Sequence, residues 1–190
     1  MSSHGDDDIR YTMWRISPRI LTMPTVGWEM VASRGPKPEI AVLRFLLPLS
    51  LAAAGSEFFA ILYKSELSFT SLLVQAVIIF SSFFIGYYLS LVLAKIFLPR
   101  DAKDFPSTPY GKLLIMTGVA SLAFFMVLEK ALPMVDFILE FLPLWTVYIL
   151  YKGMTMVVVS GDKQTFSIGV ICVVVISSPV IVEWFLSLFA

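Results

Sequence analysis

Five acidic residues lie inside or beside long apolar stretches of this sequence, where an ionised side chain is costly. Glu57 and Glu183 have apolar sequence on both sides, whereas Glu129, Asp136 and Glu140 bracket a short turn. A charge in hydrocarbon costs a few kcal/mol, so such residues face a protein interior or water and usually have a partner. The chemistry open to them is binding of a hard cation through oxygen ligands, or exchange of protons.

Two interpretations of these acids remain open. In the first, Glu57, Asp136, Glu140 and Glu183 converge on a polar cavity, and Asp136 and Glu140 share a helix face because they are four residues apart. In the second, several lie at headgroup level, and Lys64 or Lys130 pairs with the others. We favour the surface interpretation for Glu129, and neither interpretation is preferred for Glu57 and Glu183.

The residues give little support for other kinds of chemistry. His4 is the single histidine, and Cys172, the single cysteine, lies within an apolar stretch, so neither an internal disulfide nor a cysteine metal site is expected. The sequence has no Gly-rich phosphate loop, Ser-His-Asp set or HExxH helix. We therefore predict a protein that is not an enzyme, with no cofactor and no firmly predicted metal.

Five apolar stretches must position these acids. The chain of 190 residues is 58% hydrophobic and 15% charged, with a mean hydropathy of +0.85. Crossing a bilayer takes about 20 mostly apolar helical residues. The stretches run near residues 40–63, 69–98, 113–128, 134–151 and 166–189. They predict an all-α integral membrane protein: a bundle of five transmembrane helices over residues 40–190, after a cytoplasmic segment of residues 1–39.

Basic residues predict the orientation, because cytoplasmic loops accumulate Lys and Arg. Of the 14 basic residues, 12 precede or open the first span or flank the second and fourth connections; the first and third connections hold only Lys64 and Lys130. Five spans then place the N-terminus in the cytoplasm and the C-terminus outside. The net charge of zero gives no reason to expect nucleic acid as a partner.

The segment of residues 1–39 interleaves apolar residues with arginines and shows no cleavable signal peptide, since acid stands where a basic region is expected. We expect one or two short amphipathic helices on the membrane face, begun by Pro18 and Pro24. Arg19 and Trp28 are the candidate interfacial contacts with lipid.

The second span also carries a candidate helix-packing site. Ser82 and Gly86 are four residues apart, which lets another helix approach closely, and Tyr87 lies too deep for a simple interfacial anchor. We favour packing over ligand binding there. Ser177, Ser178 and Pro179 in the last span indicate close packing and a kink. A helix of about 30 residues would be roughly 45 Å long, so the ends of the second span should protrude.

A series of Pro, Trp, Gly and Tyr positions recurs in apolar surroundings. It comprises Pro24, Trp28 and Met30-Val31, then Leu46-Leu47-Pro48-Leu49, Gly86-Tyr87, Tyr110-Gly111-Lys112 and Leu150-Tyr151-Lys152-Gly153. From about Ile16 onward the chain resembles prokaryotic members of the Yip1 domain family. The resemblance implies a five-helix bundle in the bacterial cytoplasmic membrane with a cytoplasmic N-terminus.

Eukaryotic relatives in that family associate with Rab-type GTPases and with each other. Their acidic-Leu-x-Gly-Pro element has no counterpart here, where residues 23–28 read Met-Pro-Thr-Val-Gly-Trp. This departure argues against a Rab-type partner.

Two functions follow from the sequence. The first is a non-enzymatic membrane protein that organises the bilayer or recruits a membrane-protein partner or further copies of itself. The alternative is a small transporter or ion-binding protein that uses the outer carboxylates.

Overall fold

A computed structural model describes residues 18–34, 37–62, 68–132, 141–156 and 164–190. These residues form helices, turns and short connections, with no strand among them. Four helical segments are long and apolar enough to cross a membrane: Pro38–Phe59, Phe69–Phe97, Pro109–Ala131 and Gln164–Ser187. The described part of the chain is therefore all-helical and multi-pass in character.

The first spanning segment changes helical type along its length. It comprises α3 (Pro38–Ala41), the π-helical η1 (Val42–Leu46), α4 (Leu47–Ser56) and the 3-10 helix η2 (Glu57–Leu62). Pro48, in the first turn of α4, cannot donate to the Arg44 carbonyl and its ring would crowd it. The π-helical turn widens the backbone there, and Leu47 N–H donates to the Val42 carbonyl instead.

The next two helices have sharply defined ends. α5 (Phe69–Phe97) runs for 29 residues without a break, and the Leu98-Pro99 step follows it. α6 (Pro109–Ala131) begins at Pro109, and its first turn continues with Tyr110, Gly111 and Lys112 before the apolar run. Thr108 caps it by accepting a hydrogen bond from the Gly111 N–H over 3.0 Å. The predicted start near residue 113 is thus too late, since hydropathy detects the lipid-embedded part of a helix and not its capped beginning.

The remaining helices are α2 (Pro24–Arg34), α8 (Leu142–Met156) and α9 (Gln164–Ser187). α8 has 15 residues, about 22 Å of helix, which falls short of a bilayer core. The predicted fourth span was placed at residues 134–151, so its beginning lies outside the described residues. The turn between the third and fourth spans was predicted at residues 129–133. α6 continues as a helix to Ala131, so the first part of this turn is helical, and residue 133 lies outside the described residues.

α6 is the central helix. In its most apolar window 67% of residues are buried, against 44% for the other three spanning segments, and it packs against α4, α5, α8 and α9. Small residues allow these approaches: a Cβ on Gly118 would meet Val175 and Leu150. Ser121 and Thr146, both fully buried, share a hydrogen bond of 2.9 Å between α6 and α8.

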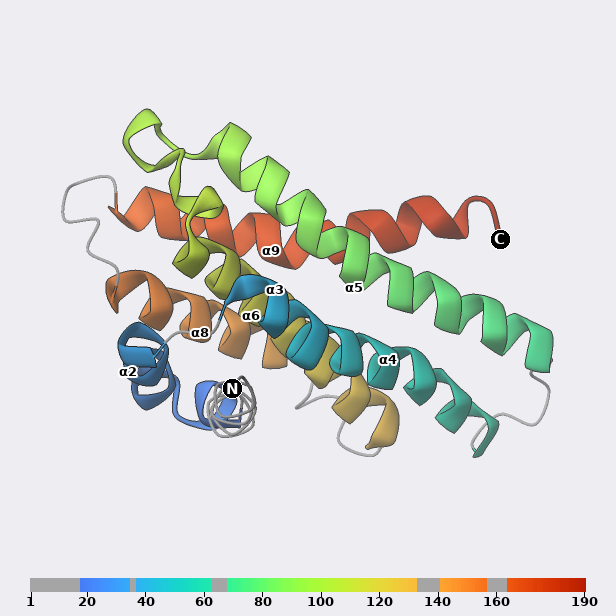
Figure 1. Cartoon of the computed structure of the whole chain (residues 1–190). Coiled ribbons are helices and arrows are strands. Elements are labelled where there is room, and N and C mark those ends of the chain that lie inside the picture. The colour runs from blue at the N-terminus through green and yellow to red at the C-terminus, as the bar shows by residue number, and fades with distance from the viewer. Residues whose placement is uncertain (1–17, 35–36, 63–67, 133–140, 157–163) are drawn as a thin grey trace, which may run out of the picture.

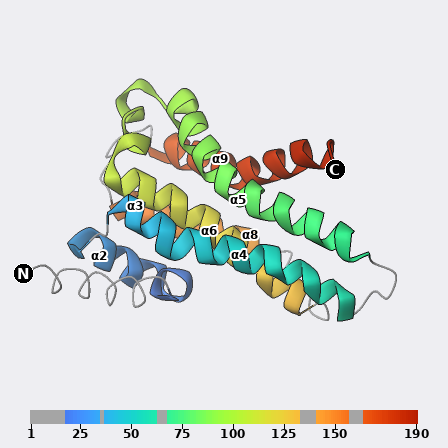
Figure 2. The same cartoon turned by 45° about the vertical axis from the view of Figure 1, so that its right-hand side comes forward.

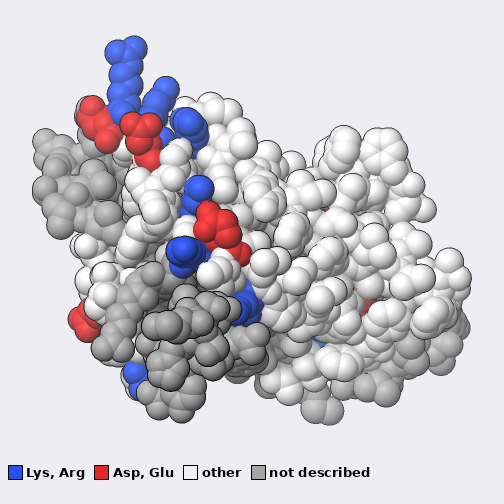
Figure 3. All heavy atoms as spheres, in the orientation of Figure 1, with Lys and Arg blue, Asp and Glu red and all other residues white. Residues whose placement is uncertain are grey.

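The long helices run along one direction of the molecule, and α2 lies beside α8 at one end, far from the C-terminus (Figures 1 and 2). Charged side chains gather toward the α2 end on the face shown in Figure 3, while most of the rest of that face carries uncharged side chains. This distribution suits a chain whose central belt contacts hydrocarbon.

α9 makes its broadest contact with α5, and Gly86 lies within it. A Cβ on Gly86 would stand 3.0 Å from the Cα and N atoms of Pro179, which is inside α9. We expect Gly86→Val to lower the midpoint of thermal unfolding, because neither backbone can yield without separating the helices. Overpacking of this kind costs about 1–3 kcal/mol.

Gly169→Val is the matched control, because a Cβ there meets nothing within 4 Å. Cys172, buried and the single cysteine, supplies the readout: a maleimide dye labels its thiol as the bundle opens on heating. Equal midpoints for the two variants would show that the α5–α9 contact does not limit stability.

Candidate functional site

Two groups of side chains at opposite ends of the bundle could carry function. The first, the Trp28 cluster, comprises Trp28, Tyr110, Leu114, Ile149 and Gly153. The Trp28 indole is fully buried, and its Nε1–H donates to the Ile149 carbonyl over 2.9 Å. Its ring lies 5.5 Å from that of Tyr110, whose hydroxyl donates to the Gly153 carbonyl over 3.1 Å. Gly153 is required because a Cβ there would collide with Leu114 and Trp28.

The N-terminal segment is held to α8 at a second point. The Nε1–H of Trp145 donates to the Leu21 carbonyl over 2.7 Å. A Cβ on Gly27 would stand 2.6 Å from Ile20, so residues 18–22 and α2 also pack closely on each other. Residues 18–34 are thus docked on the bundle at two points on α8.

This docking corrects the expectation for Trp28. The indole was predicted to contact lipid headgroups, but it is inside the protein, because an indole buried with its N–H satisfied gains more than one at an interface. Arg19, the other predicted interfacial residue, is exposed, and its Nη1 lies 3.2 Å from the Met30 sulfur.

The second group, the Glu57 cluster, comprises Glu57, Glu129, Lys130 and Glu183. Glu57 is 6% exposed and lies where α4 gives way to η2; its Oε1 is 3.0 Å from the Nζ of Lys130. Lys130, in the last turn of α6, keeps 36% of its side chain exposed. The geometry is that of an ion pair without an aligned hydrogen bond, since Glu57 Oε1 accepts none. Glu183 of α9 lies within electrostatic range of both Glu57 and Lys130.

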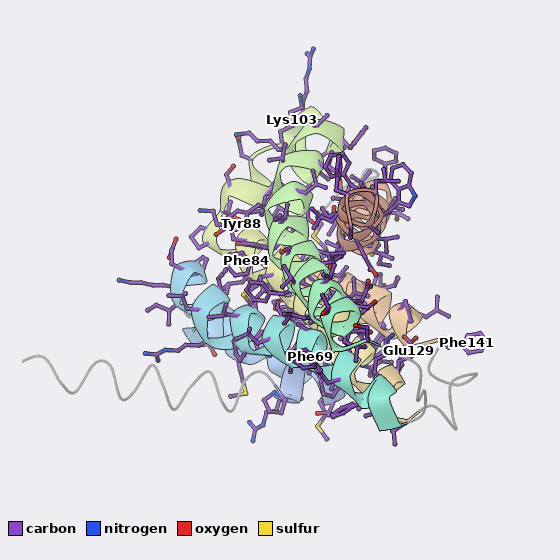
Figure 4. All side chains as sticks on the ribbon, turned by 90° about the vertical axis from the view of Figure 1, so that its right-hand side faces the viewer. Phe69, Phe84, Tyr88, Lys103, Glu129 and Phe141 are labelled. Carbon is purple, nitrogen blue, oxygen red and sulfur yellow. The ribbon has the colours of Figure 1, made fainter. Side chains whose placement is uncertain are left out.

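A cavity of about 230 Å³ adjoins this cluster. Its walls come from α5, α6, α8 and α9, and its lining residues are Phe83, Leu122, Phe125, Met126, Glu129, Pro143, Ile176, Pro179, Val180 and Glu183. Figure 4 views the molecule from this end and marks Glu129 near the last turns of α6. The cavity is apolar except at the carboxylates of Glu129 and Glu183.

The structure brings together part of the predicted acidic site. Glu57 and Glu183 lie within electrostatic range of each other, and Lys130 is the partner of Glu57, as one of the two interpretations held. Asp136 and Glu140, like Lys64, lie outside the described residues. Glu129 is exposed, as the surface interpretation expected. It also borders the cavity, and the sequence did not predict that contact.

The predicted packing residues all lie in the interior. Ser82 is 1% exposed and its Oγ donates to the Ile79 carbonyl over 2.8 Å, Tyr87 is 3% exposed, and Gly86 faces Pro179. Within the described ranges, no three His, Cys, Asp or Glu residues stand close enough together to hold a metal ion.

Over the ranges that the structure describes, fold and site define the class: an all-helical protein with four helices able to cross a membrane, a docked N-terminal segment and an ion pair between the buried Glu57 and the partly exposed Lys130. Comparison with protein-family models, with curated proteins and with solved structures gives no match.

Lys130→Met should destabilise the protein, because it leaves the Glu57 carboxylate buried without its cation. Breaking a fully buried pair costs about 3–5 kcal/mol; partial exposure of Lys130 reduces the expected loss to about 1–3 kcal/mol. Adding Glu57→Gln to this variant should restore part of the stability, since no charge is then stranded.

Lys95→Met, at an exposed lysine near the end of α5, is the control and should change stability little. Thermal unfolding followed by Cys172 labelling measures all four proteins. The pair has no stabilising role if Lys130→Met unfolds at the same temperature as Lys95→Met.

Proposed function

We propose that this chain is a non-enzymatic, five-span membrane protein of the Yip1-domain type, and that its cytoplasmic N-terminal segment recruits a protein partner. In this proposal α8 and the residues before it form the fourth span. The alternation of basic residues then places α2 in the cytoplasm and the Glu57 cluster toward the outside. The membrane implied by the resemblance is the bacterial cytoplasmic membrane.

One observation carries the proposal: residues far apart in sequence that underlie the resemblance lie together in the Trp28 cluster. Trp28 packs against Tyr110 and Gly153, and Tyr110 donates to the Gly153 carbonyl. Each of these residue types has a steric or hydrogen-bonding reason at its position. Proteins that dock the N-terminal segment in the same way would need the same residue types at these positions.

Docking also fixes which side of the segment faces outward. Met23 is 62% exposed and Val26 41% exposed, and Glu29 is exposed on the same helix as Val26. Because Trp28 and Trp145 hold the segment, these side chains are presented without loss of backbone freedom on binding. A partner with a matching apolar patch would be recruited at little entropic cost; a second copy of the chain is one such partner.

We expect the double variant Met23→Ser/Val26→Ser to reduce recovery of cross-linked partners from native membranes about tenfold. Two exposed apolar side chains supply free energy of that order when buried in an interface. Val92→Ser/Val173→Ser is the matched control, since these valines of α5 and α9 are 56% and 67% exposed but lie on other helices. Unchanged recovery with the α2 double variant would reject recruitment through this face.

A second candidate function is ion or proton handling, favoured by the Glu57–Lys130 pair and the nearby Glu183. A buried carboxylate that is paired with a lysine near a second carboxylate can exchange that partner for a proton or a substrate cation. The Glu57 cluster would then be the site that binds the proton or cation on the outer side of the membrane.

In proteoliposomes carrying the wild-type chain, we expect Glu57→Gln and Glu183→Gln each to reduce proton or cation flux at least tenfold. An amide keeps the shape of the carboxylate but carries no charge. Glu29→Gln, at an exposed residue of α2, is the control and should leave flux unchanged. Full flux in both cluster variants would remove the basis for this function.

A further inference from the structure

We propose that the cavity beside the Glu57 cluster binds a small lipophilic organic cation, with its ammonium group at Glu129 and Glu183 and its apolar body among the side chains of α5, α6 and α9. This inference rests on the second candidate function and names the substrate class of its site. The charge, the walls and the size of the cavity support it.

The charge at the cavity is negative. Lys130 is paired with Glu57, and among the described residues neither Glu129 nor Glu183 takes part in an ion pair. Glu183 is half-buried, and in the surrounding low dielectric its attraction for a cation is stronger than in water. Glu57, 6% exposed, is neutralised by the Lys130 ammonium 3.0 Å from its Oε1, so among the described residues the unpaired carboxylates of Glu129 and Glu183 set the charge at the cavity.

The walls select an organic cation over a metal ion. Eight of the ten lining residues are apolar, and two of them, Phe83 and Phe125, are aromatic residues of the kind that attract ammonium groups. A divalent metal needs about six oxygen ligands, and the described part of the cavity offers carboxylates from two residues only. An alkylammonium group instead needs negative charge on one side and apolar contact on the others.

The size of the cavity limits the ligand. About 230 Å³ lies below the range of roughly 300–1,000 Å³ for drug-sized ligands, so a single ring with a compact ammonium group is the expected scale. Pro179 contributes to the wall from within α9; having no N–H, it leaves the Val175 carbonyl without its usual helical donor. The cavity therefore borders a point where α9, although continuous, lacks one backbone hydrogen bond.

Binding of benzyltrimethylammonium to the full-length chain in nanodiscs tests the proposal, with its uncharged carbon isostere, neopentylbenzene, as the second probe. We expect the cation to bind at least tenfold more tightly than the isostere. Glu183→Gln and Glu129→Gln should each weaken cation binding about tenfold and leave isostere binding unchanged. Leu122→Trp, which fills the cavity from α6, should weaken both.

Glu39→Gln is the matched control, since Glu39 is exposed on α3 at the other end of the molecule. Delayed labelling of Cys172 confirms that each variant is folded. Equal affinity for the two probes would overturn the proposal in favour of an apolar occupant such as an acyl chain. Wild-type cation affinity in the Glu129→Gln/Glu183→Gln double variant would overturn it as well.

The binding measurement needs no ion gradient, so its result is separate from that of the flux experiment. Ion flux without cation binding would reject this substrate class and leave the second candidate function standing. Cation binding without flux would support the cavity as a ligand site and reject transport.

Discussion

The cost of leaving a polar group unpaired in hydrocarbon is the constraint on which the rest of this structure depends. Most buried hydroxyls meet it within their own helix: Ser50 donates to the Leu46 carbonyl, Ser90 to that of Gly86 and Thr117 to that of Leu113, each over 2.8 Å. Since these hydroxyls need no partner on a neighbouring helix, the helices can pack closely where their residues are small. Gly86 against Pro179 and Gly118 against Val175 are two examples.

Polar groups that cannot be satisfied locally determine which helices meet. The Trp28 indole N–H reaches a carbonyl of α8, and the carboxylate of Glu57 reaches the ammonium of Lys130 on α6. Each contact helps to fix one end of the bundle, because a buried donor or charge left without a partner is costly. The two candidate functional clusters therefore also contribute polar contacts between helices, as the Ser121–Thr146 hydrogen bond does between α6 and α8.

Local properties of the chain were predictable, and contacts between distant residues were not. Length and apolar composition are read within a window, and five spans were predicted from them. Within the described residues four of these spans correspond to helices long and apolar enough to cross a membrane, with bounds that agree to within four residues. The docking of Trp28 depends on Ile149, 121 positions away, and no pattern near Trp28 distinguishes a buried indole from an interfacial one. The partner of Glu57 was partly predictable. The cost of burying Glu57 predicted that a partner exists, and Lys64 and Lys130 were the candidates, but only the tertiary structure selects Lys130.

α6 joins the two clusters and also keeps them apart. Tyr110 lies in its first turn and Lys130 in its last, which separates them by 20 residues, about 30 Å along the helix axis. Residues more than about 10 Å apart that share no partner contribute to stability nearly independently. Coupling between the ends would need an element with two discrete arrangements, whereas α6, the most buried of the spanning helices, is held by contacts with α4, α5, α8 and α9. A partner bound at α2 and a cation bound beside Glu183 should therefore act on the protein as separate ligands, each stabilising its own end.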